Sequence, residues 1–342
     1  MKTSEFDYEL PTCLIAQKPL EPRDASRLMI VDRNLGSVEH RRFYELPDFL
    51  RKGDVVVFNN SRVFPARLYG NTSSGVKIEL LLLRKLGPSS WKTLVRPGRN
   101  MKKTNLFTIT SNGRDINCEV TEVLDDGSRI IRFLEEENLD NIGVMPLPPY
   151  IHEKLENEER YQTVYSKVLG SVAAPTAGLH FTDSLLERLR ENGVITIFVT
   201  LHVGWDSFRP VRVEEIFDHQ MHSEQWELGQ DAATIVNVAK QQGRRVVCVG
   251  TTAVRLLEQA ALSCSNEDDV VAAGSGWADL FIYPGYRFQV LDTLLTNFHL
   301  PRSTLLMLTS AFTGQDLLFR AYSAAVDEGY RFYSFGDAML IV

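Results

Sequence analysis

The stretch RVVCVGTTAVRLLEQAAL, residues 245–262, decides the fold class. Residues 246–249 (VVCV) form a short apolar run rich in β-branched side chains, which together with Arg245 predicts a buried strand. Gly250 closes that run, and residues 251–262 carry apolar side chains at helical spacing. A strand that leads through one glycine into a helix is typical of an α/β domain.

The rest of the C-terminal half repeats this alternation of strands and helices. Leu185, Leu186 and Leu189 lie at helical spacing, and Gly193 follows as a helix end. Similar signals predict helices over residues 183–192, 231–242 and 316–328 and strands over residues 194–203, 280–283 and 331–334. Alternating strands and helices imply a largely parallel sheet that is covered on both faces.

A different pattern separates residues 61–150 from this alternation. Six short β-prone runs occupy residues 66–70, 76–83, 91–95, 106–110, 116–120 and 129–133. Turn signals divide them at Ser73-Ser74-Gly75, Gly87-Pro88, Asn112-Gly113 and Asp126-Gly127. Regular short strands of this kind favour a small barrel or sandwich. Pro146-Leu147-Pro148-Pro149 ends the segment with a stiff stretch that suits a domain boundary.

The apolar run at residues 55–58, closed by Asn59 and Asn60, predicts one more strand before the β-rich segment. We expect this strand to join the later sheet. The predicted architecture is therefore a mixed α/β main domain, residues 1–60 and 151–342, interrupted by a small β-barrel domain, residues 61–150.

Composition restricts the function classes. The 342 residues suit two domains and carry a net charge of −7, so any contact with nucleic acid must come from a local basic patch. The N-terminus carries acids where a signal peptide would be apolar, and the apolar residues 305–312 are too few to cross a bilayer. We therefore expect a soluble cytoplasmic protein that binds no membrane.

Several common kinds of site are not indicated. Cys13, Cys118, Cys248 and Cys264 form no C-x-x-C pair, so we expect buried free thiols rather than zinc ligands or disulfides. The chain contains neither G-x-x-x-x-G-K-[ST] nor G-x-G-x-x-G. This argues against a nucleoside triphosphatase, a Rossmann dehydrogenase and the common glycine-rich methyltransferase.

Polar residues follow two of the predicted strands. Residues 201–204 (LHVG) close one strand, and residues 249–252 (VGTT) close another and open the helix that contains Arg255. Ligands of α/β sheets bind at the carboxyl ends of strands, and such a turn suits a carboxylate or phosphate. An ordinary capped helix start, with Thr251 or Thr252 as the cap, is the alternative.

Histidines mark two further segments. Residues 173–182 (AAPTAGLHFT) form a small-residue loop in which His180 is a candidate acid or base, or else a structural histidine. His219-x-x-His222-x-Glu224 is similar to a metal site, but no matching further ligands accompany it. We therefore expect no metal there, and an acid–base, substrate-contact or structural role instead.

The remaining polar clusters have two interpretations each. One cluster, Arg23-Asp24-x-Ser26-Arg27, is a candidate binding segment or an internal ion-pair cluster. Further amides occur in residues 59–62 (NNSR), and an amide and an imidazole occur in residues 297–301 (NFHLP). Residues 76–103 hold eight basic side chains and only one acid, Glu79. This basic stretch is a candidate RNA contact or an ordinary solvated face.

Together these segments resemble the S-adenosylmethionine:tRNA ribosyltransferase-isomerases of queuosine synthesis. The matching stretches span the whole chain and include residues 6–11 (FDYELP), 14–19 (LIAQKP), 23–29 (RDASRLM), 59–68 (NNSRVFPARL), 145–151 (MPLPPYI), 161–165 (YQTVY), 173–182, 201–204, 249–252, 281–286 (FIYPGY), 297–301 and 336–341 (GDAMLI). The resemblance implies an α/β domain with an inserted β-barrel.

The resemblance also implies a reaction. The ribosyl part of S-adenosylmethionine is transferred and isomerised onto 7-aminomethyl-7-deazaguanine at the wobble position of tRNA, which gives epoxyqueuosine and releases adenine and methionine. S-adenosylmethionine is then a consumed substrate, and no metal or other cofactor is implied. We expect a monomer.

Roles for single residues follow from this chemistry. Proton transfer requires groups that titrate near neutrality, and the sulfonium attracts carboxylates and aromatic faces. The catalytic candidates are His180, His202, His222, Glu224 and His299. The substrate-binding candidates are Arg23, Asp24, Arg27, Asn59, Asn60, Arg62, Thr176, Thr251, Thr252, Arg255, Tyr283, Tyr286 and Asn297. The tRNA-contact candidates are Lys77, Arg84, Lys85, Arg96, Arg99, Lys102 and Lys103.

The chain departs from the family pattern after its LHVG segment. Trp205, Asp206 and Ser207 stand where the family has an aromatic or aliphatic residue, Gly and Thr. Asp206 adds a charge where a flexible turn is usual. A non-catalytic tRNA-binding module on the same fold is therefore the alternative function.

Overall fold

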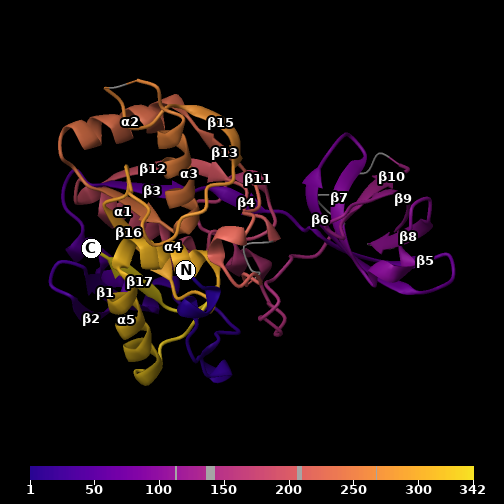
Figure 1. Cartoon of the computed structure of the whole chain (residues 1–342), viewed down its shortest axis with the longest axis horizontal. Helices are drawn as coiled ribbons and strands as arrows, with labels where there is room; N and C mark the ends of the chain where they lie inside the picture. Colours follow the sequence, from indigo (N-terminus) through magenta and orange to yellow (C-terminus); the bar gives the residue numbers. More distant parts are fainter. Residues whose placement is uncertain (112–113, 136–142, 206–209, 267) are drawn as a thin grey trace. The chain divides into compact units, whose positions relative to one another are not determined.

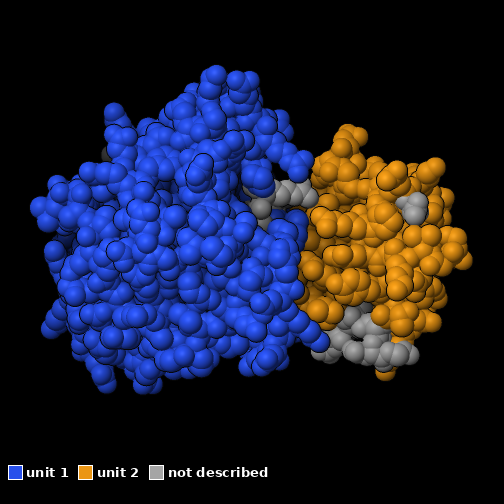
Figure 2. Space-filling view, turned by 90° about the horizontal axis from the view of Figure 1, so that it is seen from below, with its two compact units in different colours: residues 1–62, 148–168, 174–342 blue, residues 63–147, 169–173 orange. Residues whose placement is uncertain are grey.

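The computed structural model of the chain divides into two units, which Figure 2 shows in blue and orange. It describes residues 1–111, 114–135, 143–205, 210–266 and 268–342. The first unit comprises residues 1–62, 148–168 and 174–342, and the second comprises residues 63–147 and 169–173.

A nine-stranded sheet forms the centre of the first unit, in the order β15-β13-β12-β3-β14-β16-β17-β1-β2 (Figure 1). Its strands are β1 (Arg27–Asp32), β2 (Ser37–Arg42), β3 (Val55–Asn59), β12 (Ile195–Leu201), β13 (Glu224–Leu228), β14 (Val246–Val249), β15 (Gly274–Ala278), β16 (Thr293–Asn297) and β17 (Ala338–Ile341). The strand predicted at residues 55–58 joins this sheet, as expected from the sequence, and the structure places it between β12 and β14.

The sheet is mixed rather than largely parallel. The four neighbours β12, β3, β14 and β16 run parallel to one another, and β17 runs parallel to β1. The pairs β15–β13, β13–β12, β16–β17 and β1–β2 are antiparallel. The prediction of a largely parallel sheet therefore holds for its centre and is wrong for its edges. The direction of the strands reverses between β16 and β17.

The α-helices begin and end within one residue of the predicted bounds where a helix was predicted. They are α1 (Asp183–Glu191), α2 (Gln230–Gln241), α3 (Thr251–Leu262), α4 (Thr304–Thr313) and α5 (Gln315–Asp327). Short 3₁₀ helices are η1 (Thr3–Phe6), η2 (Thr12–Leu14), η3 (Arg23–Ala25), η4 (Phe43–Phe49), η5 (Gly98–Asn100), η7 (Glu158–Tyr161), η8 (Thr176–His180) and η10 (Ile216–Asp218).

One core fills the space between the sheet and α1. Val56 and Phe58 of β3 and Val247 of β14 meet Leu185 and Leu189 of α1 in a single buried cluster. The strand residues whose side chains point to the other face of the sheet, such as Val57 and Cys248, are equally buried. Both faces of the central strands are therefore covered, as buried parallel strands require.

Two predicted strands do not form. Residues 280–283 follow the edge strand β15 as a loop, in which the rings of Phe281 and Tyr283 pack edge to face at 5.2 Å. Residues 331–334 make only a single bridge, between Phe332 and Ile15. Tyr333 has a φ of 71°, a left-handed conformation that ends an extended segment. Aromatic packing rather than strand pairing explains why both segments are apolar.

The second unit contains a closed barrel in the order β10-β7-β6-β5-β8-β9. Its strands are β5 (Arg67–Thr72), β6 (Lys77–Lys85), β7 (Ser90–Arg96), β8 (Leu106–Ser111), β9 (Arg114–Val123) and β10 (Arg129–Phe133). Each of the six predicted β runs is one of these strands, and the predicted turn at Asn112-Gly113 lies outside the described residues. Closure leaves the barrel without an open edge. The predicted fold class is confirmed.

A small sheet completes the fold. β4 (Ser61–Val63) and β11 (Val168–Ser171) pair as a separate two-stranded sheet.

Cys118 and Cys248 are buried, but Cys13 is exposed and Cys264 is partly exposed. The prediction of buried thiols is thus wrong for two of the four cysteines, although all four are free as expected.

Candidate active site

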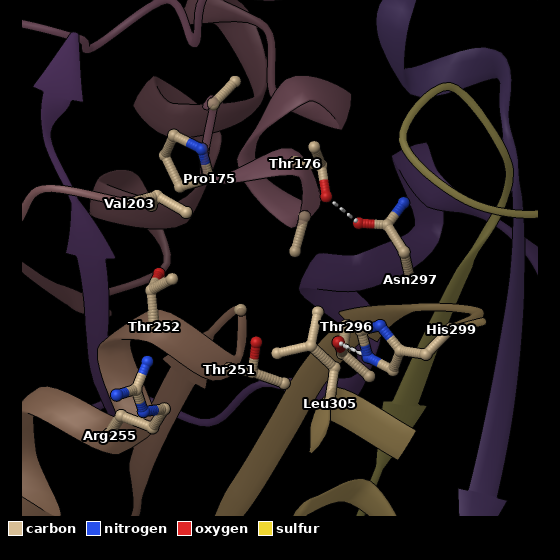
Figure 3. A pocket seen from close by; sticks show the side chains of 13 residues that line it. Pro175, Thr176, Val203, Thr251, Thr252, Arg255, Thr296, Asn297, His299 and Leu305 are labelled. Carbon is tan, nitrogen blue, oxygen red and sulfur yellow. Dashed lines mark hydrogen bonds between the residues drawn. The ribbon is translucent and has the colours of Figure 1, made fainter. Parts of the chain in front are cut away.

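A pocket opens in the first unit where the central parallel strands end. β12, β14 and β16 finish beside it, so it lies at the carboxyl edge of the sheet where α/β ligands bind. It contains about 510 Å³ of empty volume, which includes the open solvent at its mouth. Figure 3 shows the side chains that line it: Ala174, Pro175, Thr176, Ala177, Val203, Gly250, Thr251, Thr252, Arg255, Thr296, Asn297, His299 and Leu305.

The turn from β14 into α3 forms one wall of this pocket. Gly250 is the N-cap of α3 and has a φ of 85°, which a residue with a side chain rarely adopts. Thr251 and Thr252 begin the helix, and Thr252 Oγ1 accepts a hydrogen bond from Asn59 Nδ2 at 3.2 Å. The helix N-terminus therefore faces the pocket with hydroxyls and N–H groups, an arrangement that suits a carboxylate or phosphate.

A buried ion pair links this helix to β13. Arg255 of α3 donates from Nη1 to Glu224 Oε2, and its Nη2 donates to the Ala278 carbonyl at 3.2 Å. Glu224 Oε1 accepts from the Gly204 amide at 2.8 Å and from His222 Nε2 at 3.2 Å. Burial alone would raise the pKa of Glu224, but Arg255, His222 and the Gly204 amide together lower it to about 2. Glu224 is therefore a carboxylate at neutral pH.

The ionised Glu224 determines the tautomer of neutral His222. A carboxylate only accepts hydrogen bonds, so the proton of the imidazole lies on Nε2. Nδ1 then carries the basic lone pair. A carboxylate that orients an imidazole in this way is the usual support for a histidine acting as a general base.

Asn297, at the end of β16, connects the pocket to the interior. Its Nδ2 donates to the carbonyls of Tyr333 at 3.2 Å and Asp337 at 3.4 Å. Carbonyls only accept, so these contacts fix which way the amide points. Nδ2 also donates to His180 Nε2 at 3.2 Å, and Oδ1 accepts from Thr176 Oγ1 at 3.0 Å (Figure 3).

His180 consequently carries its proton on Nδ1, which donates to Ser26 Oγ at 2.8 Å. Its ring stacks on Phe43 with centroids 4.8 Å apart. Burial, with smaller effects of Arg331 and Arg23, lowers the pKa of His180 to about 3. His180 is thus a neutral hydrogen-bonding group at physiological pH, and it does not line the pocket.

The other two candidate histidines are also neutral near pH 7. Burial lowers the pKa of His299 to about 3, and its Nε2 is 2.8 Å from Thr296 Oγ1 within the pocket (Figure 3). Burial lowers the pKa of His202 as well, against the opposing effect of Glu227. Nδ1 of His202 is buried without a hydrogen-bond partner among the described residues. It follows directly after β12, next to the pocket residue Val203.

Comparison with known proteins decides the family. The family described as Queuosine biosynthesis protein matches residues 3–341. The chain belongs to this family. The S-adenosylmethionine:tRNA ribosyltransferase-isomerase of Desulfitobacterium hafniense is 52% identical over 347 residues and that of Moorella thermoacetica 53% over 348, with 100% of each chain covered. The predicted family and the prediction of an enzyme, a transferase, are confirmed.

A solved structure is similar over the same length. The crystal structure of an S-adenosylmethionine tRNA ribosyltransferase from Thermotoga maritima is 39% identical and has a TM-score of 0.57. The match covers 99% of this chain and 100% of the other. The queuosine biosynthesis fold therefore extends over essentially the whole chain.

The structure brings only some of the predicted site residues of this queuosine biosynthesis protein together. Thr176, Thr251, Thr252, Arg255, Asn297 and His299 line one pocket. Asn59 supports it from behind, because its side chain also bonds both the amide and the carbonyl of Leu201. Sequence reasoning missed Thr296 and Leu305, although Thr296 directly precedes the NFHLP motif and Leu305 begins the apolar run at residues 305–312.

Other predicted residues do not line this pocket. Arg27 lies 3.7 Å above the Tyr330 ring, and Arg62 contacts Ser166 Oγ at 3.0 Å and pairs with Glu159. Four more make contacts of their own: Asp24 with Thr182, Asn60 with Thr200, Tyr283 with Phe217 and Phe281, and Tyr286 with Glu258.

Three further expectations concern absences and the loop after residue 205. No cluster of three or more His, Cys, Asp or Glu side chains suited to a metal ion occurs among the residues that the structure describes. Within the same residues, no helix is both long and apolar enough to cross a bilayer. Asp206 and Ser207, which motivated the non-catalytic alternative, lie outside the described residues.

The barrel register divides the basic stretch into two groups. All seven predicted contacts, Lys77, Arg84, Lys85, Arg96, Arg99, Lys102 and Lys103, are at least partly exposed. In the strand register, Arg96 of β7 lies opposite Glu79, near the start of β6. Arg84 and Lys85 lie at the other end of β6, about 20 Å away if each residue extends the strand by about 3.3 Å. Lys77 lies at the same end as the loop of residues 96–103. The eighth basic residue, Lys92, forms an ion pair with Asp126 at 2.7 Å.

Proposed function

We propose that the protein transfers and isomerises the ribosyl group of S-adenosylmethionine onto 7-aminomethyl-7-deazaguanine at the wobble position of tRNA. The product is epoxyqueuosine in the tRNA, and adenine and methionine are released. The observation that carries this proposal is a pocket at the carboxyl edge of the sheet, with the N-terminus of α3 in its wall, in a full-length member of the queuosine biosynthesis family. S-adenosylmethionine is the consumed donor, and no resident cofactor takes part.

The donor binds in the pocket with its methionyl carboxylate at the start of α3. Thr251, Thr252 and the N–H groups that follow Gly250 supply donors, and the helix dipole favours the negative charge. Arg255 contributes from the same wall, while its ion pair with Glu224 keeps it in place. The apolar side chains of Val203, Pro175 and Leu305 enclose the rest of the ligand.

His222 is the base that we assign to the first step. It does not line the pocket itself, but its contact with Glu224 joins it to Arg255, which does. The sulfonium acidifies the adjacent 5′ carbon, and Nδ1 of His222 takes that proton while Glu224 stabilises the imidazolium that forms. His180 and His299, with pKa values near 3, serve as neutral hydrogen-bonding groups. Adenine takes up a proton as it leaves, and methionine leaves with the electrons of the broken carbon–sulfur bond.

The exposed basic residues of the barrel contact the tRNA. Residues 96–103 with Lys77 form the larger group and provide a local positive field on a protein whose net charge is −7. Arg84 and Lys85 form a second, smaller contact. The enzyme acts as a monomer in the cytoplasm, where its tRNA substrate is found.

One incubation tests the proposed function. The protein is mixed with S-adenosylmethionine and a tRNA that carries 7-aminomethyl-7-deazaguanine, and adenine and the modified nucleoside are quantified. Adenine release with conversion of the base supports the proposal. Binding of the tRNA without turnover, restored to turnover by Asp206→Gly, would instead establish the non-catalytic alternative.

A further inference from the structure

A second pocket lies in the first unit behind the active-site wall. It contains about 260 Å³ of empty volume, which includes the open solvent at its mouth. Its lining combines two arginines with hydroxyl, imidazole and apolar groups and, among the described residues that form it, includes no acid: Pro19, Leu20, Arg23, Ser26, Arg160, Leu179, His180, Ser334, Phe335 and Gly336. Cations beside apolar surfaces suit a ligand that carries an anionic group on a larger body.

Backbone carbonyls, which position a guanidinium without neutralising it, hold both arginines of this pocket, and one of the two also pairs with an exposed carboxylate. Arg23 donates to the carbonyls of Leu179 at 3.1 Å and Glu159 at 3.0 Å. Arg160 donates to the Leu20 carbonyl and pairs at 3.3 Å with the carboxylate of Glu21, a side chain that is 78% exposed. Each guanidinium has five N–H donors, which is more than these contacts use.

Neighbouring groups add to the positive character of the pocket. Arg23 and Arg160 are close enough that Arg160, after burial, is the next largest cause of a lowered Arg23 pKa of about 10, while Glu21, Asp183 and Glu159 act in the opposite direction. Nη1 of Arg331 is buried without a hydrogen-bond partner among the described residues. Arg331 also contributes to the low pKa of His180 in the pocket wall.

A short chain of side chains joins this pocket to the donor pocket. Thr176 and Asn297 line the donor pocket, and His180 and Ser26 line the second one. The four are linked in sequence: Thr176 Oγ1 to Asn297 at 3.0 Å, Asn297 to His180 at 3.2 Å and His180 to Ser26 at 2.8 Å. Three hydrogen bonds through these four side chains therefore connect a group bound in the second pocket to the donor pocket.

We propose that this second pocket binds a backbone phosphate of the RNA substrate close to the nucleotide that is modified. Arginine forks match the geometry of phosphate oxygens, and an RNA places phosphates beside every nucleotide. The inference rests on the proposed function, because it assumes that the substrate is an RNA. Free inorganic phosphate presents the same anionic oxygens as a backbone phosphate, and the experiment distinguishes binding of free phosphate from binding of RNA.

The test measures RNA binding without turnover. An anticodon stem–loop RNA with an unmodified guanine at the wobble position is titrated at several salt concentrations into wild type, Arg160→Ala and Arg160→Lys. We expect Arg160→Ala to weaken binding about tenfold and to reduce the log–log salt slope by about 0.7, the value for one contact to single-stranded nucleic acid. Arg160→Lys keeps the charge and retains the slope but recovers only part of the affinity.

Arg188→Ala is the matched control. Arg188 likewise donates to a backbone carbonyl, that of Tyr44, and pairs with an exposed carboxylate, Asp48, but it lies outside the second pocket. Equal losses of RNA affinity in Arg160→Ala and Arg188→Ala would overturn the proposal. The proposal would also be overturned if inorganic phosphate competed with the RNA for wild type but not for Arg160→Ala, while both proteins bound the RNA equally well. Because RNA binding is read without reaction, these outcomes are distinct from failure of the wild type to release adenine.

Discussion

At the scale of single residues, the buried pair of Arg255 and Glu224 is the most consequential contact of the site. Both side chains are at most 3% exposed, so removing one charge leaves the other without compensation. We predict that Arg255→Leu lowers the free energy of unfolding by about 3–5 kcal/mol in urea titrations. Arg188→Leu, which breaks the exposed pair with Asp48, should cost at most about 1 kcal/mol. Equal losses would show that the buried pair contributes nothing special.

His299 gives the protein a pH-dependent stability. Its pKa is about 3 in the folded chain, against an ordinary value of 6.5, so between these values the unfolded chain binds a proton that the folded chain does not. Its contribution is therefore fully present above pH 6.5 and declines as the pH falls toward 3. We predict that His299→Gln makes the loss of stability between about pH 6 and pH 4 shallower, by at most about 1.4 kcal/mol per pH unit.

Unfolding titrations at a series of pH values check the His299 prediction. His152→Gln, which removes an exposed histidine, is the control and should leave the pH dependence close to that of wild type. A His299→Gln variant with the wild-type slope would mean that His299 is protonated in the folded protein.

Residue types and spacing allowed the pocket to be anticipated but not its internal pairing. Thr251, Thr252 and Arg255 were expected together because one turn carries them. Nothing in the spacing indicated that Arg255 pairs with Glu224, 31 residues earlier in the chain, or that Asn297 holds His180 from 117 residues away. Such partners depend on which strands become neighbours, and that order is set by the whole sheet.

At the scale of elements, the turn between β14 and α3 depends on Gly250. A Cβ there would meet Ala177 Cβ at an acceptable 3.6 Å, so the cost of a side chain comes from the φ of 85° and not from a clash. We predict that Gly250→Ala destabilises the fold by about 1–3 kcal/mol and raises the KM for S-adenosylmethionine. Gly243→Ala is matched, since its φ is 66° and a Cβ there meets no atom of the described residues within 4 Å. It should lower stability comparably without changing that KM, and a KM change in both variants would contradict the assignment.

Four of the five α-helices in the described part of the chain were predictable because glycine ends and apolar spacing are local signals, whereas α4 was not predicted. The strands predicted at residues 280–283 and 331–334 failed because aromatic residues that pack on one another give the same composition as a strand. Phe332, for example, meets the rings of Phe298 and Tyr322 at centroid distances of 5.0 and 6.1 Å. The antiparallel edges of the sheet were not predictable either, because the sequence of a single strand does not indicate whether its neighbours run parallel or antiparallel to it.

At the scale of the whole molecule, the acidic chain must attract tRNA through local fields. We predict that replacing Arg96, Arg99, Lys102 and Lys103 together with Ala weakens tRNA binding and flattens its salt dependence, by roughly 0.7–0.9 in log–log slope for each phosphate that the variant no longer neutralises. The pair Arg84→Ala and Lys85→Ala, at the other end of β6, tests the second group separately. Binding of S-adenosylmethionine should not change in either variant. Unaltered tRNA affinity at every salt concentration in the quadruple variant would make these residues an ordinary solvated face.

The proposed reaction moves the ribosyl group, and not the methyl group, of S-adenosylmethionine onto the tRNA. The most direct measurement uses two donors, one labelled in the ribose and one in the methyl group, each incubated with the enzyme and a tRNA that carries 7-aminomethyl-7-deazaguanine. We predict that the ribose label is recovered in the wobble nucleoside and that the methyl label is recovered in free methionine. Methyl label in the tRNA, or ribose label that stays with adenine, would contradict it.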